Sequence, residues 1–138
     1  MSKALSIDFG LARTGLAISD NDKMFAFGID TVKSELLMDK INELIQKEDV
    51  DEIVIGFPKR LNNEDSHVTE NVRLLKVKLE EELEEVKVHL LDERFTSKMA
   101  SKAMHDAGLN RKKKKQKELV DKVSATIILQ DFLANRPV

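Results

Sequence analysis

The chain has 138 residues and contains no cysteine, tryptophan or tyrosine. This length corresponds to about one domain, and the absence of cysteine excludes a disulfide scaffold and any thiolate metal site. No apolar run approaches the ~20 residues that span a bilayer, and the N-terminus has no signal-peptide pattern, so we expect a cytosolic protein with no membrane partner. The formal net charge of −2, from 23 basic and 25 acidic residues, by itself argues against a nucleic-acid-binding protein.

Three short, mostly apolar runs come first along the chain, at residues 4–9, 15–19 and 24–32. The turns between them are short enough for hairpins, which predicts three antiparallel strands. Ser34 is expected to cap a helix over 35–46, because apolar residues recur there on one face. A buried type of strand follows over 52–55 and is expected to stop at Gly56 and Pro58.

The second half of the chain alternates between predicted helices and one more strand. Ser66 is expected to cap a helix whose apolar residues recur at helical spacing from Val68 to Leu83. A strand is predicted over 87–91, then a short helix that Thr96 or Ser97 caps and Gly108 ends. A basic loop and a last helix from about residue 118 to 133 complete the chain.

This order of elements predicts an α/β fold. The first three strands form an antiparallel meander, and the two later strands, connected through helices, run parallel. The expected result is a mixed five-stranded sheet with helices on both faces. No linker or repeat divides the sequence, so residues 1–138 are expected to form a single domain.

The near balance of charge conceals two opposed segments. Residues 80–93 contain seven acids and one base, whereas residues 94–117 contain nine bases and one acid. A run of like charges is commonly a solvated, mobile segment. It can also be a binding surface for a phosphate backbone, and the composition leaves both interpretations open.

Acidic residues occur where a sheet of this kind would gather them. Asp8 lies inside the first apolar strand, the pair Asp92 and Glu93 closes the last strand, and Asp121 shares the apolar face of the last helix. Each has an ordinary structural explanation, such as a strand-end acid or an acid near a helix N-terminus. Parallel strands, however, bring their carboxyl ends together. Three carboxylates that meet need a cation, and oxygen ligands favour Mg²⁺ or Mn²⁺.

Several segments, in this order, resemble motifs of the YqgF family, also called RuvX. Residues 7–20, IDFGLARTGLAISD, resemble its opening D-[FY]-G-x-x-R-x-G-x-A-x-S-D motif. Ile55-Gly56-Phe57-Pro58 resembles its G-x-P, and Asp92-Glu93-Arg94-Phe95-Thr96-Ser97 resembles D-E-R-[FL]-T-[TS]. The basic run from Arg111 and the stretch from Asp121 to Gln130 resemble its closing motifs. The resemblance covers about residues 3–133 and implies an RNase H-like fold of the Holliday-junction resolvase group.

The same resemblance implies a nuclease that matures the 5′ end of 16S ribosomal RNA or resolves branched DNA. Its catalytic and metal-binding residues would be Asp8, Glu93 and Asp121, with Asp92 as a helper. Arg13, Arg94 and Thr96 would either bind phosphate or hold these acids in place. A further set of basic residues would bind the phosphate backbone: Arg111, Lys112, Lys113, Lys114 and Lys115. The partners would be pre-16S rRNA, ribosomal precursor particles or branched DNA.

Two positions depart from the expected pattern, and two other functions stay open. Gly56 and Phe57 stand where RuvC-type resolvases carry an acid, and the loop after Pro58 has no glycine. The combination of Asp8, Gly10 and Gly15 also resembles a phosphate loop of actin-like ATPases and sugar kinases, although the chain has room for only one of their two domains. A non-catalytic RNA- or ribosome-binding module is the third alternative. The sequence leaves the oligomeric state undetermined.

Overall fold

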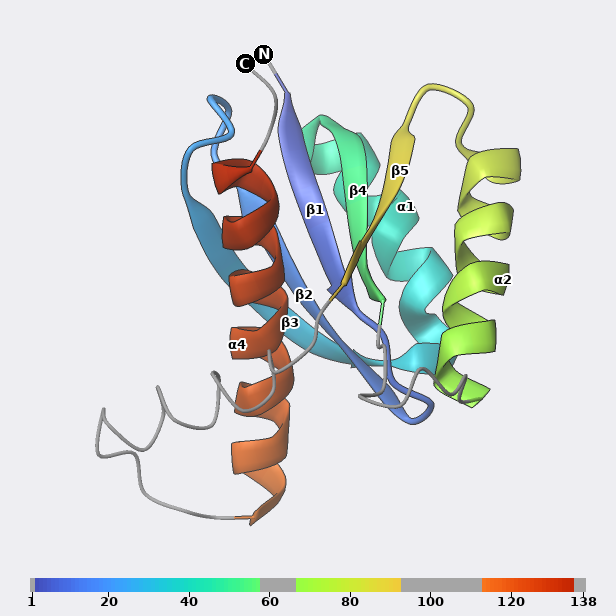
Figure 1. Cartoon of the computed structure of the whole chain (residues 1–138), viewed down its shortest axis with the longest axis vertical. Helices are drawn as coiled ribbons and strands as arrows, with labels where there is room; N and C mark the ends of the chain where they lie inside the picture. The colour runs from blue at the N-terminus through green and yellow to red at the C-terminus, as the bar shows by residue number, and fades with distance from the viewer. Residues whose placement is uncertain (1, 58–66, 93–112, 136–138) are drawn as a thin grey trace.

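The computed structural model describes residues 2–57, 67–92 and 113–135, and they are arranged around one sheet (Figure 1). The elements follow the chain in this order: β1 (Lys3–Asp8), β2 (Arg13–Ser19), β3 (Ala26–Lys33), η1 (Ser34–Leu36), α1 (Leu37–Glu48), β4 (Val50–Phe57), α2 (His67–Glu82), β5 (Lys87–Asp92) and α4 (Lys113–Ala134). The five strands lie in the order β3-β2-β1-β4-β5. No helix of the described residues is long and apolar enough to cross a membrane.

The sheet is mixed, as the sequence predicts. Strands β1, β2 and β3 form an antiparallel meander, while β4 runs parallel to both β1 and β5. Strand β1 therefore lies at the centre, with one neighbour of each direction. Helices cover both faces of this strand, which explains why Ala4, Leu5, Ser6 and Ile7 are all buried although their side chains alternate between the faces.

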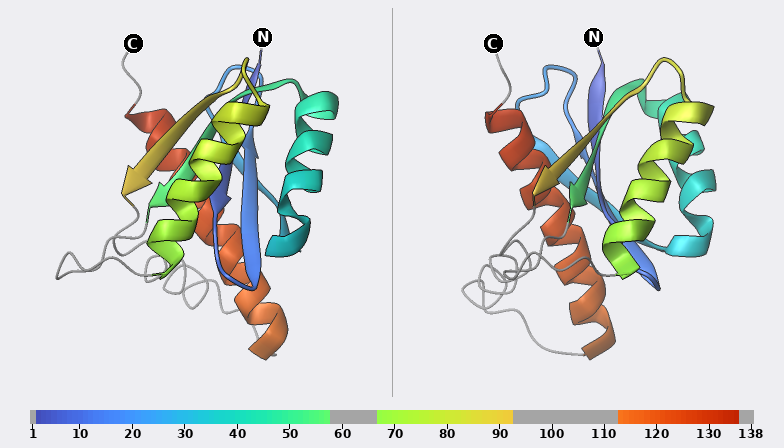
Figure 2. Two further views of the ribbon diagram at one scale, coloured as in Figure 1. Left: turned by 90° about the vertical axis from the view of Figure 1, so that its right-hand side faces the viewer. Right: turned by 45° about the vertical axis from the view of Figure 1, so that its right-hand side comes forward.

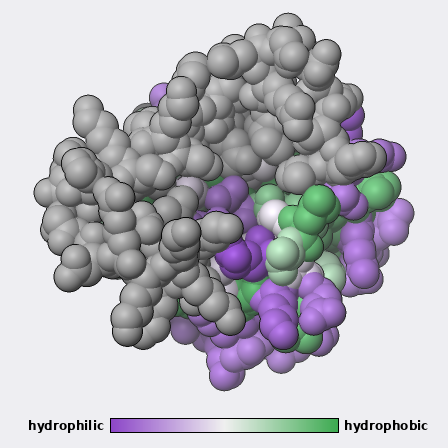
Figure 3. Space-filling view, turned by 90° about the horizontal axis from the view of Figure 1, so that it is seen from below, coloured by the Kyte–Doolittle hydropathy of each residue, from purple (hydrophilic) through white to green (hydrophobic). Residues whose placement is uncertain are grey.

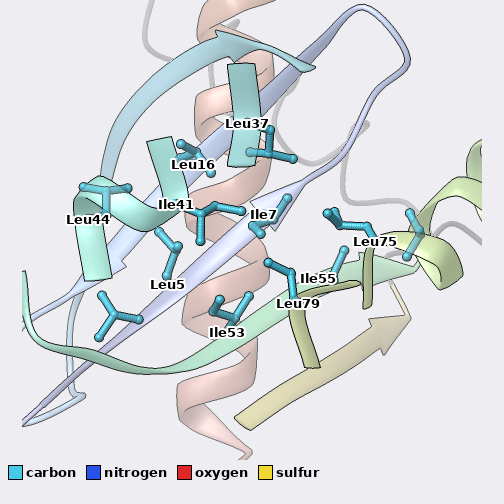
Figure 4. Packing of buried hydrophobic residues seen from close by; sticks show 12 residues of the cluster. Leu5, Ile7, Leu16, Leu37, Ile41, Leu44, Ile53, Ile55, Leu75 and Leu79 are labelled. Carbon is cyan, nitrogen blue, oxygen red and sulfur yellow. The ribbon is translucent and has the colours of Figure 1, made fainter. Parts of the chain in front are cut away.

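Helices cover both faces of the sheet, as Figure 2 shows in side view. On one face, α1 and α2 pack over the larger hydrophobic core (Figure 4). That core consists of strand residues and helix residues in interdigitated rows: Leu5, Ile7, Leu16, Leu37, Ile41, Leu44, Val50, Ile53, Ile55, Val72, Leu75 and Leu79. On the other face, among the described residues, α4 is the helix that packs on the sheet, through Ala125, Ile128 and Leu129. The predicted apolar faces of these helices are confirmed.

Three predictions about element boundaries are wrong. The hydroxyl of Ser34 caps no helix, because it donates a 2.5 Å hydrogen bond to the Gly10 carbonyl and lies 2.8 Å from the Thr14 hydroxyl. A 3₁₀ turn fills the space, and α1 begins only at Leu37. Strand β4 does not stop at Gly56, since Gly56 and Phe57 continue the ladder with β5.

The third correction concerns the basic run. Helix α4 begins at Lys113, so the predicted loop is wrong from this residue onward. Lysine is a good helix former, and the three consecutive lysines Lys113, Lys114 and Lys115 extend the helix well before residue 118. The predicted short helix between Thr96 and Gly108, and the predicted cap at Ser66, lie outside the described residues.

Candidate metal and nucleic-acid site

The candidate site lies at the end of the sheet where β1, β4 and β5 finish and β2 begins, which we call the carboxyl end. Helices α1, α2 and α4 all begin at this end (Figures 1 and 2). Figure 3 views the molecule from this side, and hydrophilic residues lie near its middle next to a group of apolar ones. Ligand sites of sheets with parallel strands are found at this end.

Asp8 is the last residue of β1, and the alternation of the strand assigns its face. Ile7 packs with α1 and α2, while Ala4 packs with α4 and the Ser6 hydroxyl donates to the Ala125 carbonyl of α4 at 2.5 Å. Because side chains alternate, Asp8 lies on the α4 face. Across the ladder it pairs with Gly15 of β2.

Asp121 is brought to the same place by a close contact between helix and strand. A Cβ atom on Gly15 would overlap the backbone carbonyl of Asp121, so α4 can approach β2 here only because this residue is glycine. Since Gly15 is the cross-strand partner of Asp8, the Asp121 backbone of α4 lies over the face of the sheet to which Asp8 belongs. The structure thus brings together Asp8 and Asp121, which are far apart in the sequence.

Arg13 completes the described part of the site. It begins β2, and its Nε atom donates a hydrogen bond of 2.6 Å to Oδ2 of Asp121. The two side chains are 34% and 25% exposed, so the ion pair is partly shielded from water. Of the two roles that the sequence left open for Arg13, contact with an acid of the site is the one observed.

The turn that precedes Arg13 is fixed by a small polar network. Ser34 donates through its backbone N–H to the Ala12 carbonyl at 3.1 Å and through its hydroxyl to the Gly10 carbonyl. Gly10 also lies so close to the Arg13 carbonyl that a Cβ atom would stand 2.5 Å from that oxygen. Hydrogen bonds from Ser34, which follows β3, therefore fix the backbone of the turn between Asp8 and Arg13.

The remaining predicted site residues cannot be placed in the same way. Glu93, Arg94, Arg111 and Lys112 lie outside the described residues, and so does Thr96. Lys113, Lys114 and Lys115 form the first turn of α4. Within residues 2–57, 67–92 and 113–135, no three Asp, Glu, His or Cys side chains are grouped so that they could hold a metal ion. Asp8 and Asp121 supply hard oxygen donors, and Asp121 already binds one cation, the Arg13 guanidinium, so this pair fits part of a Mg²⁺ or Mn²⁺ site.

Sequence reasoning missed three contributors to this site. Gly15 allows α4 to approach β2 closely, and the Ser6 hydroxyl connects β1 to α4 by a hydrogen bond to the Ala125 carbonyl. Lys33 ends β3 directly opposite Arg13, so its cationic side chain lies on the same face of the sheet. A signal existed for Gly15 alone, because a glycine inside a strand marks a close backbone approach. The contacts of Ser6 and Lys33 depend on the strand register.

The opposite end of the sheet holds a separate charged cluster. Lys23 Nζ lies 2.7 Å from both Asp51 Oδ1 and Glu52 Oε1. Burial alone would lower the pKa of Lys23, but the hydrogen bonds to the two carboxylates raise it above its ordinary value. For Asp51, burial works to raise the pKa, and the hydrogen bonds from Lys23 and Ser2 outweigh it and lower the pKa. The cluster stabilises the hairpin between β2 and β3 and is remote from Asp8.

Solved structures with the same arrangement of elements support the fold. A structure described as "T. thermophilus RuvC in complex with Holliday junction substrate" matches with a TM-score of 0.59 at 14% identity over 97% of this chain and 95% of that one. The yeast mitochondrial Holliday junction resolvase Ydc2 matches with a TM-score of 0.56 at 11% identity, over 96% of this chain and 78% of its own. At such identities the likeness shows the fold alone, and the predicted RNase H-like fold is confirmed.

Sequence relatives match over almost the whole chain. Proteins called "Putative pre-16S rRNA nuclease" are 42% identical in *Bacteroides fragilis*, 41% in *Phocaeicola vulgatus* and 40% in *Flavobacterium psychrophilum*. Each match covers 99% of this chain and 98–99% of the relative. The family model described as "RuvX: Holliday junction resolvase" matches residues 2–135. The chain therefore belongs to the RuvX family, as its motifs predicted.

Proposed function

We propose that this protein is a metal-dependent endonuclease that hydrolyses phosphodiester bonds in structured nucleic acid, with the 5′ end of pre-16S rRNA as its substrate. The observation that carries the proposal is that Asp8 and Asp121 lie on the same face of the sheet at its carboxyl end. The names of the relatives at 40–42% identity supply the substrate. On this proposal residues 1–138 act as one nuclease domain in ribosome biogenesis in the cytoplasm.

Asp8, Asp121 and Glu93 would hold Mg²⁺ or Mn²⁺. Glu93 as the third ligand, with Asp92 as a helper, rests on the resemblance of Asp92-Glu93-Arg94 to the family motif. The bound ions would lower the pKa of a water molecule and stabilise the leaving oxygen. The protein contributes the position of its carboxylates, which a central strand and a closely packed helix fix independently of substrate.

The basic residues would bind the phosphate backbone and fix its position, without reading the sequence. These residues are Arg13, Arg94, Arg111, Lys112, Lys113, Lys114 and Lys115. The placement of the lysines supports this role. The first turn of α4 holds lysines and no acid, although the helix dipole favours acids there and disfavours cations. A phosphate group at that helix start would relieve the conflict, which gives the run a functional reason that a merely solvated segment lacks.

The experiment is a cleavage assay of the purified chain on a pre-16S rRNA fragment and on a four-way DNA junction, with Mg²⁺ or Mn²⁺. The wild type should cut the RNA and leave a 5′-phosphate, whereas Asp8→Asn and Asp121→Asn should lose cleavage by at least a hundredfold. Asp131→Asn is the matched control, because Asp131 is an exposed acid on the same helix, and it should retain wild-type activity.

Each alternative function has its own outcome in this assay. Cleavage of the junction in place of the RNA would identify a Holliday junction resolvase, the function that the description of the family model names. Tight RNA binding without cleavage under every condition would identify a non-catalytic binding module. Equal cleavage by the wild type and Asp8→Asn would refute the proposed site.

The role of the lysine run is tested separately by changing Lys112, Lys113, Lys114 and Lys115 to alanine. RNA affinity should fall, and the slope of log affinity against log salt should become shallower by about 0.7–0.9 for each lost phosphate contact. Lys76 and Lys78 on α2 provide the control, since a double alanine variant there should leave the slope unchanged. A quadruple variant with the wild-type slope would contradict the role.

A further inference from the structure

The ion pair between Arg13 and Asp121 joins two parts of the proposed site that are expected to do different tasks. Asp121 belongs to the proposed metal ligands, and Arg13 belongs to the residues proposed to bind phosphate. In the structure the 2.6 Å hydrogen bond from Nε of Arg13 to Oδ2 of Asp121 links them directly. A carboxylate oxygen of a proposed metal ligand is therefore engaged by a guanidinium cation.

The neighbourhood shows that the carboxylate keeps Arg13 in this place. The residue opposite Arg13 in the β2–β3 ladder is Lys33, and like charges at directly opposite positions repel. Both side chains lie on the α4 face, where Arg13 contacts Asp121 and Lys33 is exposed. The negative charge of Asp121 thus offsets the repulsion between Arg13 and Lys33.

A divalent metal ion on Asp121 and the guanidinium on the same carboxylate would stand within a few ångströms of each other. Two like charges at this separation repel each other strongly where water is partly excluded, and a doubly charged ion repels more. The two cations therefore compete for Asp121. Arg13 is one-third exposed and sits at the start of a strand, so its side chain has room to turn toward solvent.

We propose that Arg13 is a positioning residue that occupies Asp121 in the free protein and releases it when a substrate phosphate takes the guanidinium. A phosphate accepts two parallel N–H bonds from a guanidinium, which is a better geometry than the single Nε contact to Asp121. Substrate would then promote metal binding, and by linkage metal would promote substrate binding to the same extent. This inference rests on the proposed function, because it takes Asp121 as a metal ligand.

The test measures Mn²⁺ affinity of the full chain by calorimetry, without any turnover. Competition predicts that Arg13→Met binds Mn²⁺ about fivefold more tightly than the wild type, which corresponds to about 1 kcal/mol. A merely structural role predicts the opposite sign, since Asp121 would lose its support and the affinity would fall. Lys33→Met is the matched control, because it removes one positive charge from the same cross-strand pair without contacting Asp121. It should change the affinity less than twofold.

A second measurement follows the coupling itself. A stem-loop from the 5′ end of pre-16S RNA should tighten Mn²⁺ binding about fivefold in the wild type and in Lys33→Met, and leave it unchanged in Arg13→Met. Arg13→Lys retains the charge but lacks the paired N–H groups, so it should restore only part of the coupling. Equal coupling in the wild type and Arg13→Met would overturn the inference.

Asp121→Asn separates failure of this inference from failure of the proposed function. If Asp121→Asn weakens Mn²⁺ binding at least tenfold while Arg13→Met does not tighten it, the metal site stands and the competition is refuted. If Asp121→Asn and Asp8→Asn both bind Mn²⁺ as the wild type does, the proposed metal site is refuted, and the competition with it. Circular dichroism on each variant confirms that the fold is retained.

Discussion

Gly15→Ala tests the contact that brings Asp121 to Asp8. The new Cβ atom would overlap the Asp121 carbonyl and stand 3.1 Å from the backbone nitrogen of Lys122. Both are backbone atoms of a helix, so no side chain can turn away. To reach even 3.0 Å, the shortest separation that real Cβ contacts show, α4 has to move off β2 by about 1 Å at this point. Overpacking of this kind costs about 1–3 kcal/mol, and a displacement of about 1 Å costs an active site about a hundredfold in rate.

Urea denaturation and the pre-16S cleavage assay measure the two consequences. We expect a free energy of unfolding lower by about 2 kcal/mol, and a rate lower by about a hundredfold at a temperature where the variant is folded. Gly28→Ala is the control, because its Cβ atom would meet only side-chain atoms of Lys122 and Thr126 at 2.8–3.0 Å, and these can rotate. It should change stability by less than 1 kcal/mol. A Gly15→Ala variant as stable and as active as Gly28→Ala would show that α4 does not seat on β2 as described.

Two further predictions concern stability. Lys23→Met should cost about 1–2 kcal/mol near pH 7, because it leaves Glu52, 8% exposed, without its lysine. The raised pKa of Lys23 gives stability that is lost as pH rises through it, and the lowered pKa of Asp51 gives stability that is lost as pH falls through it. Chemical denaturation from pH 2 to 11 should therefore show a deficit that is largest between about pH 5 and 10, and a deficit independent of pH would contradict the cluster. On α2, Leu79→Ala should cost about 2–5 kcal/mol and Leu74→Ala less than 0.5 kcal/mol, since Leu79 is buried and Leu74 is 60% exposed; equal losses in thermal melts would refute the assigned helix face.

The sheet could be predicted because its signals are local. Short turns force the first three strands to run antiparallel, and a helix between two strands allows a parallel crossover. The helical spacing of Leu37, Ile41 and Leu44, and of Val72, Leu75 and Leu79, indicated which faces are buried, and both sets lie in the core. Each pattern is the spacing of apolar residues within a single helix or strand, so it can be read from the sequence without knowledge of the fold.

The boundaries that were wrong depend on partners elsewhere in the fold. Ser34 has the chemistry of a helix cap, but the fold uses its hydroxyl for the Gly10 carbonyl, 24 residues away. Gly56 looks like a strand terminator, and pairing with β5 on one side keeps it in the ladder. The lysines from Lys113 onward look like a solvated loop, and they continue a helix that is anchored later by Ala125 and Ile128. Tertiary contacts override local preference in each case.

The candidate site could be predicted in its residue types and only partly in its geometry. Asp8 and Asp121 were recognised because an acid inside an apolar pattern is costly without a partner. Their meeting depends on Gly15, and the pairing of Arg13 with Asp121 spans 108 residues, which no local period encodes. Family resemblance identified Arg13 as important and left its two roles open.

The two ends of the fold differ in charge for a reason that the topology itself imposes. At the carboxyl end of the sheet β1 finishes at Asp8, and helices α1, α2 and α4 begin. The positive ends of three helix dipoles therefore lie at the same end of the fold as the candidate carboxylate site. The positive helix ends favour a phosphate backbone there, and the carboxylates would hold the metal ion of the proposed site. At the other end α1 and α2 finish, and a groove between them is lined by Asp49, Asp51, Glu84 and Glu85 with no basic residue. We therefore expect nucleic acid to approach the carboxyl end rather than this acidic groove, so a net charge of −2 is compatible with the proposed RNA binding.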